Sequence, residues 1–272
     1  MRLARILHRR ALLPRLALER DGFLFDVETL EAALGAAVPV PGSPSSFRAR
    51  VVALGLAGLR ELDQRVLRGE RPKAAAIEPR EAVLLPPFDA ESGAHLHLNP
   101  ALLSRSAEVG LSRAVLGHQA FIGATKSRGF ARAGIGYVLG EDLQRATLKD
   151  VRDAVSGVTL TLHWGDFAEH MITQAGPVVV TTNELRLRDA VMTLRSSRRT
   201  QRFTFTREIV DSFDARLMQL SEELELRGGD LVSFESPLTD EVSVHEPVHV
   251  EIPTLCLSGT AVPRRPRDAD SA

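Results

Sequence analysis

A succession of short strand-like runs, each closed by turn residues, dominates the chain after residue 82 and restricts its fold more than any other feature. The runs rich in apolar and β-branched residues are Ala82–Leu85, His95–Leu98, Ile135–Leu139, Val158–Trp164, Val178–Val180, Ala190–Leu194, Phe203–Phe205, Leu231–Phe234 and Val248–Ile252. Apolar residues at helical spacing interrupt them over Leu148–Val155 and Arg207–Glu223. Thr147 and Asp150 form a capping-box pattern at the start of the first helix. The pattern predicts a β-rich domain of the α+β class.

The residues before this domain predict a small N-terminal α/β domain. Asp21-Gly22 lies between two strand-like runs, and an Asp-Gly pair in that position is a strong hairpin signal. The predicted strands are Arg2–Ile6, Leu16–Glu19 and Phe23–Val27, and the predicted helices are Glu28–Ala37 and Phe47–Leu67. The predicted boundaries are 1–75 for this domain, 76–262 for the β-rich domain and 263–272 for a disordered polar tail.

Composition removes several classes of partner. The 272 residues carry 34 basic and 35 acidic side chains, so a net charge of −1 gives no electrostatic reason to expect nucleic acid or an anionic membrane. No apolar stretch reaches the roughly 18 residues that cross a bilayer. A single cysteine, Cys256, suits a reducing compartment. We therefore predict a cytoplasmic protein without nucleic-acid or membrane partners.

The order of motifs in the β-rich domain resembles the fumarylacetoacetate hydrolase superfamily. Four segments carry the resemblance: Gly134–Gly140 followed by Val155–Thr159, then Leu162–Trp164, Gly176–Leu185 and Leu226–Ser233. They are similar to the family's "E-x-E-L-A-V-V-I-G … V-x-G-Y-T", "N-D-W/V", "G-P-x-x-V-T-x-D-E-L" and "L-x-P-G-D-x-I-x" segments. The resemblance implies a mixed β-sandwich roll with the small N-terminal domain, and a homodimer. It also implies a small oxo-acid or β-dicarbonyl substrate.

The family's metal ligands are not matched. The resemblance implies Mg²⁺ or Mn²⁺ between two Glu and an Asp, and these positions fall on Arg132, Gly134 and His163. A hard cation needs oxygen ligands, with carboxylates supplying negative charge. Here a guanidinium, a hydrogen and an imidazole replace the three carboxylates, which makes the local charge more positive. We therefore expect no metal at these positions and no other cofactor.

Two further catalytic segments of the family depart from its pattern as well. In the lid pattern "N-Y-x-x-H-x-x-E", Asn99 and Glu108 survive, whereas the His position falls on Arg105 or Ser106. The "T-G-T-P" loop appears as residues 234–237, where Glu235 replaces the glycine. Glu235 either contacts the substrate or faces water.

Arg132 and His163 are chemically useful replacements. A guanidinium at position 132 could hold a substrate carboxylate through bidentate hydrogen bonds, or it could be a surface group paired with Asp166 or Glu169. His163 could be a general base oriented by Asp166, or a structural histidine beside Trp164.

Other side chains offer weaker alternatives. Lys126 lies in a polar, glycine-bearing loop that could receive an anion or could simply be solvated. His95 and His97 are two apart on one strand, roughly 7 Å along it, so with His163 they could bind a transition metal, or they could be ordinary strand-face histidines. Four arginines at 195, 198, 199 and 202 suggest an exposed hairpin, or a site for an acidic partner.

Two functions remain open on the sequence alone. The first is an enzyme that acts on a small oxo-acid or β-dicarbonyl compound by C–C bond hydrolysis, decarboxylation or isomerisation. Its predicted catalytic residues are His163, Glu108 and Asp166, and its predicted substrate-binding residues are Arg132, Lys126, Asn99 and Glu235. The second is a catalytically inactive binding or regulatory subunit with the same fold, because a fold alone does not determine function.

Overall fold

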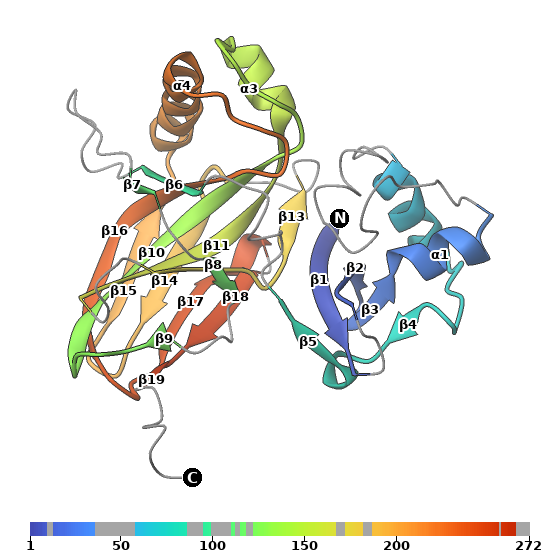
Figure 1. Cartoon of the computed structure of the whole chain (residues 1–272), viewed down its shortest axis with the longest axis horizontal. Coiled ribbons are helices and arrows are strands. Elements are labelled where there is room, and N and C mark those ends of the chain that lie inside the picture. Colours follow the sequence, from blue (N-terminus) through green and yellow to red (C-terminus); the bar gives the residue numbers. More distant parts are fainter. Residues whose placement is uncertain are drawn as a thin grey trace.

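The structure is a computed structural model that describes residues 1–9, 13–35, 58–85, 95–98, 110–111, 115–117, 122–166, 172–181, 187–255 and 257–264. Within this part, helices and mostly antiparallel strands share one molecule (Figure 1), which confirms the predicted α+β class. No helix in these ranges has the length and apolar character that a bilayer crossing requires.

The elements follow the chain in the order that Figure 1 labels. The strands are β1 (Arg2–His8), β2 (Arg15–Arg20), β3 (Phe23–Asp26), β4 (Ala76–Ile77), β5 (Ala82–Leu84), β6 (His95–Leu98), β7 (Gly110–Leu111), β8 (Val115–Gly117), β9 (Ile122–Gly123), β10 (Arg128–Leu139), β11 (Val155–Gly165), β12 (Ile172–Ala175), β13 (Val179–Thr181), β14 (Val191–Arg195), β15 (Thr200–Thr204), β16 (Leu231–Ser243), β17 (Val248–Ile252), β18 (Leu257–Ala261) and β19 (Pro263–Arg264). The helices are α1 (Val27–Ala33), a helix over 58–67, α3 (Leu148–Ala154) and α4 (Arg207–Glu223), with 3₁₀ turns at Pro79–Glu81 and Pro253–Leu255.

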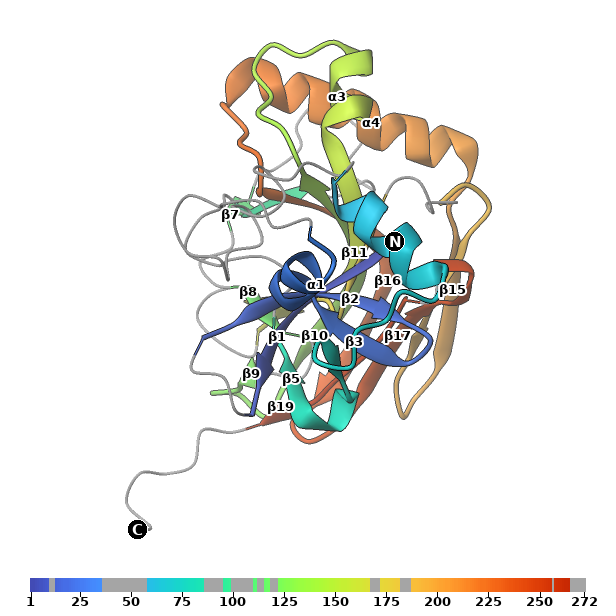
Figure 2. The ribbon, with the colours of Figure 1, turned by 90° about the vertical axis from the view of Figure 1, so that its right-hand side faces the viewer.

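The N-terminal strands continue the main sheet. Its order is β4-β3-β2-β1-β13-β11-β10-β16-β6-β7, and β5, β8 and β12 join it at β1, β12 and β11. The junction is the antiparallel pairing of β1 with β13, in which Arg2 lies opposite Val180. α1 lies beside β2 in Figure 2. Val27 and Leu30 belong to a buried apolar cluster with Leu3 of β1 and Leu18 of β2. The division at residue 75 stays a prediction, and β5 beyond it pairs with β1.

The hairpin at Asp21-Gly22 and the predicted helices are found in the structure, except that α1 begins at Val27 and ends at Ala33, so Leu34 and Gly35 of the predicted helix Glu28–Ala37 form a turn instead. Asp21 and Gly22 both adopt positive φ, 51° and 78°, between β2 and β3. The Thr147–Asp150 capping box is present at α3, and α4 begins and ends at the predicted residues. Only the last ten residues of the predicted helix Phe47–Leu67, 58–67, lie in the described ranges, and these are helical.

A second sheet, in the order β15-β14-β17-β18, covers one face of the long strands β10, β11 and β16. Alternate residues of those strands, such as Ile135, Leu160 and Phe234, enter a common apolar core with Leu194 and Val250 of the second sheet. Burial of these side chains stabilises the fold by removing apolar surface from water. This core therefore occupies one face of the main sheet. The other face carries polar residues of β10, β11 and β16, and next to the N-terminal strands a second apolar cluster that includes Val138 and Leu231.

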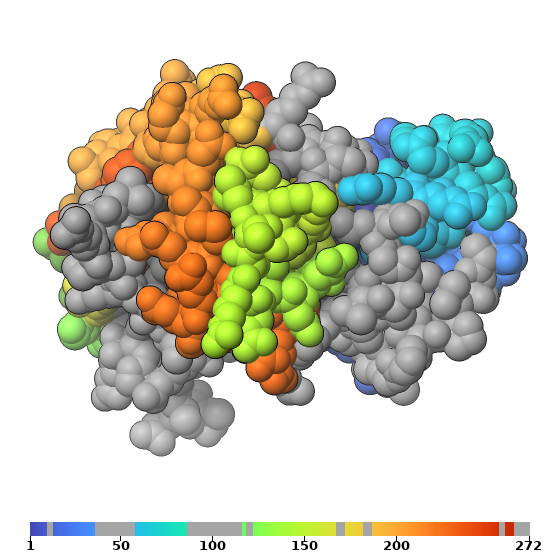
Figure 3. Space-filling view, turned by 90° about the horizontal axis from the view of Figure 1, so that it is seen from above, coloured from blue at the N-terminus to red at the C-terminus, as the bar shows by residue number. Residues whose placement is uncertain are grey.

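Helices α3 and α4 lie side by side at one end of the sheets (Figure 3), and charged pairs join them. Arg152 of α3 donates through Nε to Asp214 of α4 at 2.9 Å, and its Nη2 lies 3.3 Å from Asp211. Burial raises the pKa of the Asp214 carboxyl, an effect that Arg152 opposes and Asp211 reinforces. Asp214 is therefore the member of this group that couples stability to pH.

A raised pKa means that the folded chain holds the Asp214 proton more tightly than the unfolded chain does. The contribution of Asp214 to the free energy of unfolding therefore falls as pH rises through the interval between the two pKa values. The amide oxygen of Asp214→Asn can still accept from Arg152. We expect the free energy of unfolding of this variant to increase relative to that of the wild type as the pH rises from about 4 to about 7. Urea unfolding at both pH values measures the difference, and an equal difference at the two values would contradict the assignment.

Candidate functional site

The polar face of the main sheet gathers residues from four neighbouring strands. His163 of β11 lies opposite Thr173 of β12 and opposite Arg132 of β10. One step along, Thr161 lies opposite Gly134, which in turn lies opposite Glu235 of β16. Because directly paired residues project from the same face of a sheet, these side chains share one surface.

Two glycines on β10 bring together side chains from β11 and β16, two strands that do not pair with each other. Gly134 and Gly136 lie between β11 and β16, where a side chain would otherwise separate them. A Cβ atom at Gly134 would lie 2.5 Å from the carbonyl oxygen of Phe234 and 2.8 Å from Thr161 Oγ1. Across this gap Ser233 Oγ donates to Thr161 Oγ1 at 3.0 Å. The Gly-x-Gly pattern therefore forms the floor of the site.

His163 is fully buried, and hydroxyl groups contact both of its ring nitrogens. Nδ1 lies 3.2 Å from Thr173 Oγ1, and Nε2 lies 2.9 Å from Ser233 Oγ and 3.2 Å from Thr161 Oγ1. A hydroxyl both donates and accepts, so this shell satisfies either neutral tautomer. The carboxylate predicted to orient His163 does not do so, because Asp166 is exposed and follows the end of β11 with a φ of 62°.

Arg132 forms an ion pair with Glu235. Its Nη1 donates to Oε2 of Glu235, whose side chain is 3% exposed, whereas the Arg132 side chain is 27% exposed. The guanidinium also lies over the Phe130 ring, 5.4 Å from its centroid. The ring in turn occupies the space where a side chain at Gly165 would be. Arg132 therefore pairs with Glu235 and not with Asp166, and Glu235 does not face water, which were two of the alternatives that the sequence left open.

An irregular bulge in β16 positions Glu235. Arg132 and Gly134 of β10 lie opposite Thr239 and Glu235 of β16. Residues 236–238 of β16 therefore lie opposite a single residue of β10, Ala133. Ser236 Oγ donates to the carbonyl of Ala133 at 2.7 Å and accepts from the amide of Leu238 at 3.2 Å. The segment predicted to be a loop is therefore a fixed part of a strand.

The structure brings Arg132, His163 and Glu235 together, whereas Lys126 and Asp166 are exposed and lie outside β10 and β11. Lys126 is exposed and precedes β10, whereas Arg132 lies four residues into that strand, roughly 13 Å beyond its start. Asn99 and Glu108 lie outside the described residues, and so does Glu169. His95 and His97 lie on β6 in register with Leu231 and Ser233. Their side chains lie outside the described part of the chain.

The sequence prediction missed the residues that surround His163. Thr161, Thr173 and Ser233 supply its hydroxyl partners, and Phe130 supplies the ring beneath Arg132. One signal was present in the sequence. Thr161 and His163 alternate with apolar Leu160 and Leu162 on one strand, which assigns both polar residues to the same face.

The residues present do not fit the Mg²⁺ or Mn²⁺ that the resemblance implies. Arg132 places a fixed positive charge at one ligand position, and backbone atoms fill the space for any side chain at Gly134. At the third position, both nitrogens of His163 lie within hydrogen-bond distance of hydroxyl groups. No group of three metal-ligating side chains occurs among the described residues. These three residues therefore do not supply the oxygen ligands that a hard cation needs.

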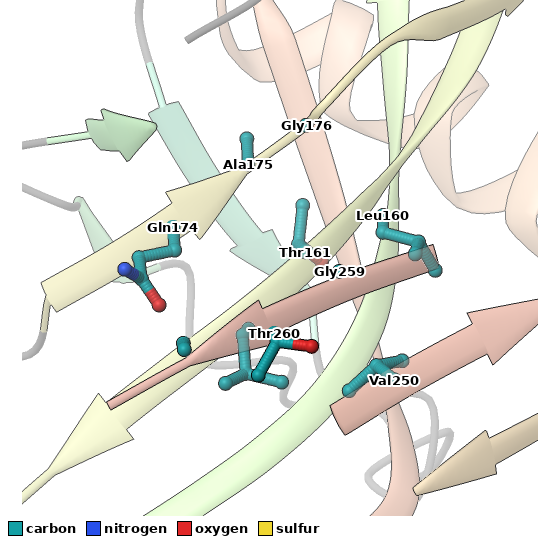
Figure 4. Close-up of a pocket in the computed structure, with 10 residues that line it drawn as sticks. Leu160, Thr161, Gln174, Ala175, Gly176, Val250, Gly259 and Thr260 are labelled. Atoms are coloured by element: carbon teal, nitrogen blue, oxygen red, sulfur yellow. The ribbon is translucent and has the colours of Figure 1, made fainter. Parts of the chain in front are cut away.

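Two hollows lie away from Arg132. A cavity of about 20 Å³ lies between β11 and β12 on one side and β17 and β18 on the other (Figure 4), and this volume holds about one water molecule. A larger hollow of about 290 Å³ is lined by Arg2, Glu19, Arg20, Asp21, Leu67, Val180, Thr254 and Leu255. Its charged groups are paired, since Arg2 contacts Glu19 at 2.9 Å and Arg20 contacts Asp63 at 2.6 Å. Neither hollow contains a group that suggests chemistry.

The arginines of residues 195–202 lie on an exposed hairpin, as predicted. Three of them pair with acids of this same chain: Arg195 with Glu251, Arg198 with Glu241, and Arg199 with Asp240. The alternative of a separate acidic partner is therefore not needed to explain their charge. The hairpin and β16 hold each other in place.

Comparison with known proteins identifies the fold. No protein-family model and no curated protein matches this sequence. Among solved structures, maleylpyruvate hydrolase from Sphingobium sp. SYK-6, in complex with manganese(II) and pyruvate, is similar with a TM-score of 0.75 and 17% identity, over 98% of this chain and all of that one.

Two further solved structures are similar to this chain, each over 98% of this chain and all of the other. Fumarylacetoacetate hydrolase from Exiguobacterium antarcticum has a TM-score of 0.72 at 12% identity, and 2-hydroxyhepta-2,4-diene-1,7-dioate isomerase from Mycobacterium marinum has 0.68 at 14%. At these identities the likeness establishes the fold. The chain therefore has the fold of the fumarylacetoacetate hydrolase superfamily, as the motif order predicted.

Proposed function

We propose that this chain is an enzyme acting on a small oxo-acid or β-dicarbonyl compound, and that Arg132 binds the acid group in place of the family's metal. The observation that carries the proposal is the placement of Arg132, a partly exposed guanidinium on the polar face beside His163. The names of the structural relatives support the substrate class, since they are hydrolases and isomerases of such acids and one was solved with pyruvate.

The proposed chemistry uses the chain's own charges. Arg132 offers donors in a planar fork that matches a carboxylate and also stabilises negative charge on an adjacent oxygen. In hydrolysis of an acylpyruvate, water adds to the distal carbonyl, the C–C bond breaks, and the pyruvate carbon accepts a proton. His163 is the group proposed to take the proton from water and return it to carbon. Asn99 and Glu108, which lie outside the described residues, remain predicted contributors, whereas Asp166 and Lys126 are exposed and no hydrogen bond or ion pair joins them to His163 or Arg132 among the described residues.

One observation favours the second candidate, a binding or regulatory subunit without catalysis. His163 is fully buried within its shell of hydroxyls, so no described path leads from its ring nitrogens to solvent. Carboxylate binding at Arg132 does not depend on that path. Binding and turnover therefore separate the two candidates, and the homodimer that the resemblance implies is proposed for both.

Substitution of Arg132 tests the proposal. We expect protein treated with a chelator to bind pyruvate, and Arg132→Ala to weaken the binding at least about 100-fold, because the charged hydrogen bonds to the carboxylate are lost. Arg128→Ala is the matched control, since Arg128 lies on the same strand face but is 67% exposed. Calorimetric titration measures both, with and without Mn²⁺.

Turnover decides between the candidates. Hydrolysis of an acylpyruvate that disappears in Arg132→Ala supports the enzyme, and binding without turnover supports the regulatory subunit. Equal pyruvate affinity in Arg132→Ala and the wild type would overturn the role of Arg132. Pyruvate binding that requires Mn²⁺ would overturn the metal-independent site.

A further inference from the structure

The charge of Arg132 is already balanced within the fold. Glu235 contacts the guanidinium directly and is almost completely buried, so solvent does little to screen its carboxylate. Of the two acids predicted as partners of Arg132, Asp166 is exposed at the end of β11, and Glu169 lies outside the described residues. Of the charged side chains placed on this face, Arg132 and Glu235 form a pair whose formal charges cancel.

Glu235 is fixed in this position by its backbone. Gly134 lies opposite it, and the Ser236 hydroxyl ties the bulge to the carbonyl of Ala133 at 2.7 Å. Beyond the bulge, Arg199 and Gln201 of the second sheet donate to the carbonyl of Thr239 at 2.8 and 2.9 Å. These bonds fix the backbone on both sides of Glu235, and the burial of its side chain together with the contact to Arg132 keeps the carboxylate at the site.

Arg132 nevertheless keeps donors for a ligand. A guanidinium carries five N–H donors, and Nη1 is the atom that contacts Glu235. Within the described part of the chain this is the hydrogen bond that Arg132 makes, while Phe130 supports the plane of the guanidinium. A carboxylate can therefore bind the outer edge of the fork while Glu235 remains on the inner side.

Such a ligand meets two charges of opposite sign at short range. The guanidinium attracts the carboxylate, and the fixed Glu235 carboxylate repels it. We infer that Glu235 is the residue that sets charge selectivity at this site: it lowers the affinity of Arg132 for carboxylates, and it disfavours a dicarboxylate more strongly than a monocarboxylate. This inference rests on the proposed binding of an oxo-acid at Arg132.

Glu235→Gln isolates charge from geometry, because the amide oxygen can still accept from Arg132. We expect it to bind pyruvate at least about tenfold more tightly than the wild type. The gain for 2-oxoglutarate, which carries a second carboxylate, is expected to be larger than the gain for pyruvate. Calorimetric titration of both acids measures the two ratios.

Two variants serve as controls for charge and folding. Asp214→Asn removes another buried carboxylate, one that pairs with Arg152 between α3 and α4, and is expected to leave both affinities unchanged. Glu235→Met removes the charge with an apolar side chain of similar length. It replaces Glu235→Gln in the comparison if the thermal unfolding curve shows that the amide variant does not fold.

The outcomes separate the inference from the proposed function. If the wild type binds pyruvate and the uncharged variants bind it no more tightly, the inference is wrong and the oxo-acid site stands. Equal gains for pyruvate and 2-oxoglutarate overturn the selectivity. If neither the wild type nor a folded uncharged variant binds either acid, the oxo-acid site itself is wrong, and Glu235 is then only a structural partner of Arg132.

Discussion

Gly134→Ala is expected to destabilise the fold by about 3 kcal/mol or more, the upper end of the cost of overpacking a core. The added methyl group would lie 2.5 Å from the carbonyl oxygen of Phe234 and 3.2 Å from the Cα of Glu235. Both contacts are backbone atoms, so no side-chain rotation can relieve them. β16 would have to move away from β10, which breaks the ladder between the two strands.

A second glycine provides the control for this prediction. Gly123 lies in β9, where a Cβ atom would have no neighbour within 4 Å, and its φ is not in the left-handed region. Gly123→Ala is therefore expected to change the free energy of unfolding by less than about 0.5 kcal/mol, as surface substitutions usually do. Urea unfolding of both variants measures the contrast. Similar stability of the two would show that the strands around Gly134 can separate.

This close packing also bears on the metal. The sequence predicts the loss of a cation from residue types alone, because Arg132, Gly134 and His163 supply no carboxylate. The structure adds a steric reason. A carboxylate side chain at position 134 would need the space that Phe234 and Thr161 now fill. Restoring charge at position 132 alone would therefore leave the site without its second oxygen ligand.

The sequence predicted elements well where the local signals agreed with one another. α4 has both its apolar stripe and its N-cap, Thr206, and its bounds were predicted correctly. β16 was predicted to end at Phe234 but continues to Ser243. The segment after Phe234 has the composition of a loop, and only a bulge stabilised by Ser236 allows it to stay in the sheet. Sequence spacing does not reveal such a tertiary contact.

The site was predictable only in part, because some of its contacts join residues that are far apart in the sequence. The motif order placed Arg132 and His163 at one site, and the register of β10 with β11 makes them neighbours. Ser233 is 70 residues from His163 in sequence and lies one strand further away, so only the two glycines between them allow contact. Asp166 looked close because it is near in sequence. The end of β11 at Gly165 and the turn at Asp166 separate it from the imidazole.

Phe213→Ala is expected to cost about 3–5 kcal/mol, the usual range for removing a buried aromatic side chain. Phe213 of α4 stacks on Phe234 with 4.3 Å between ring centroids, and it meets the edges of Tyr137 and Phe205 at 6.3 Å. All four rings are buried. The substitution therefore leaves a cavity between α4 and β16, and it also removes favourable aromatic contacts.

The effect should reach the polar face, because Phe234 lies between Ser233 and Glu235 in the same strand. Phe23→Ala is the matched control, since that ring is 44% exposed at the start of β3 and its removal leaves no enclosed cavity. We expect a loss of less than about 1 kcal/mol there. Urea unfolding compares the two variants. A loss at Phe213 as small as that at Phe23 would mean that α4 does not anchor β16.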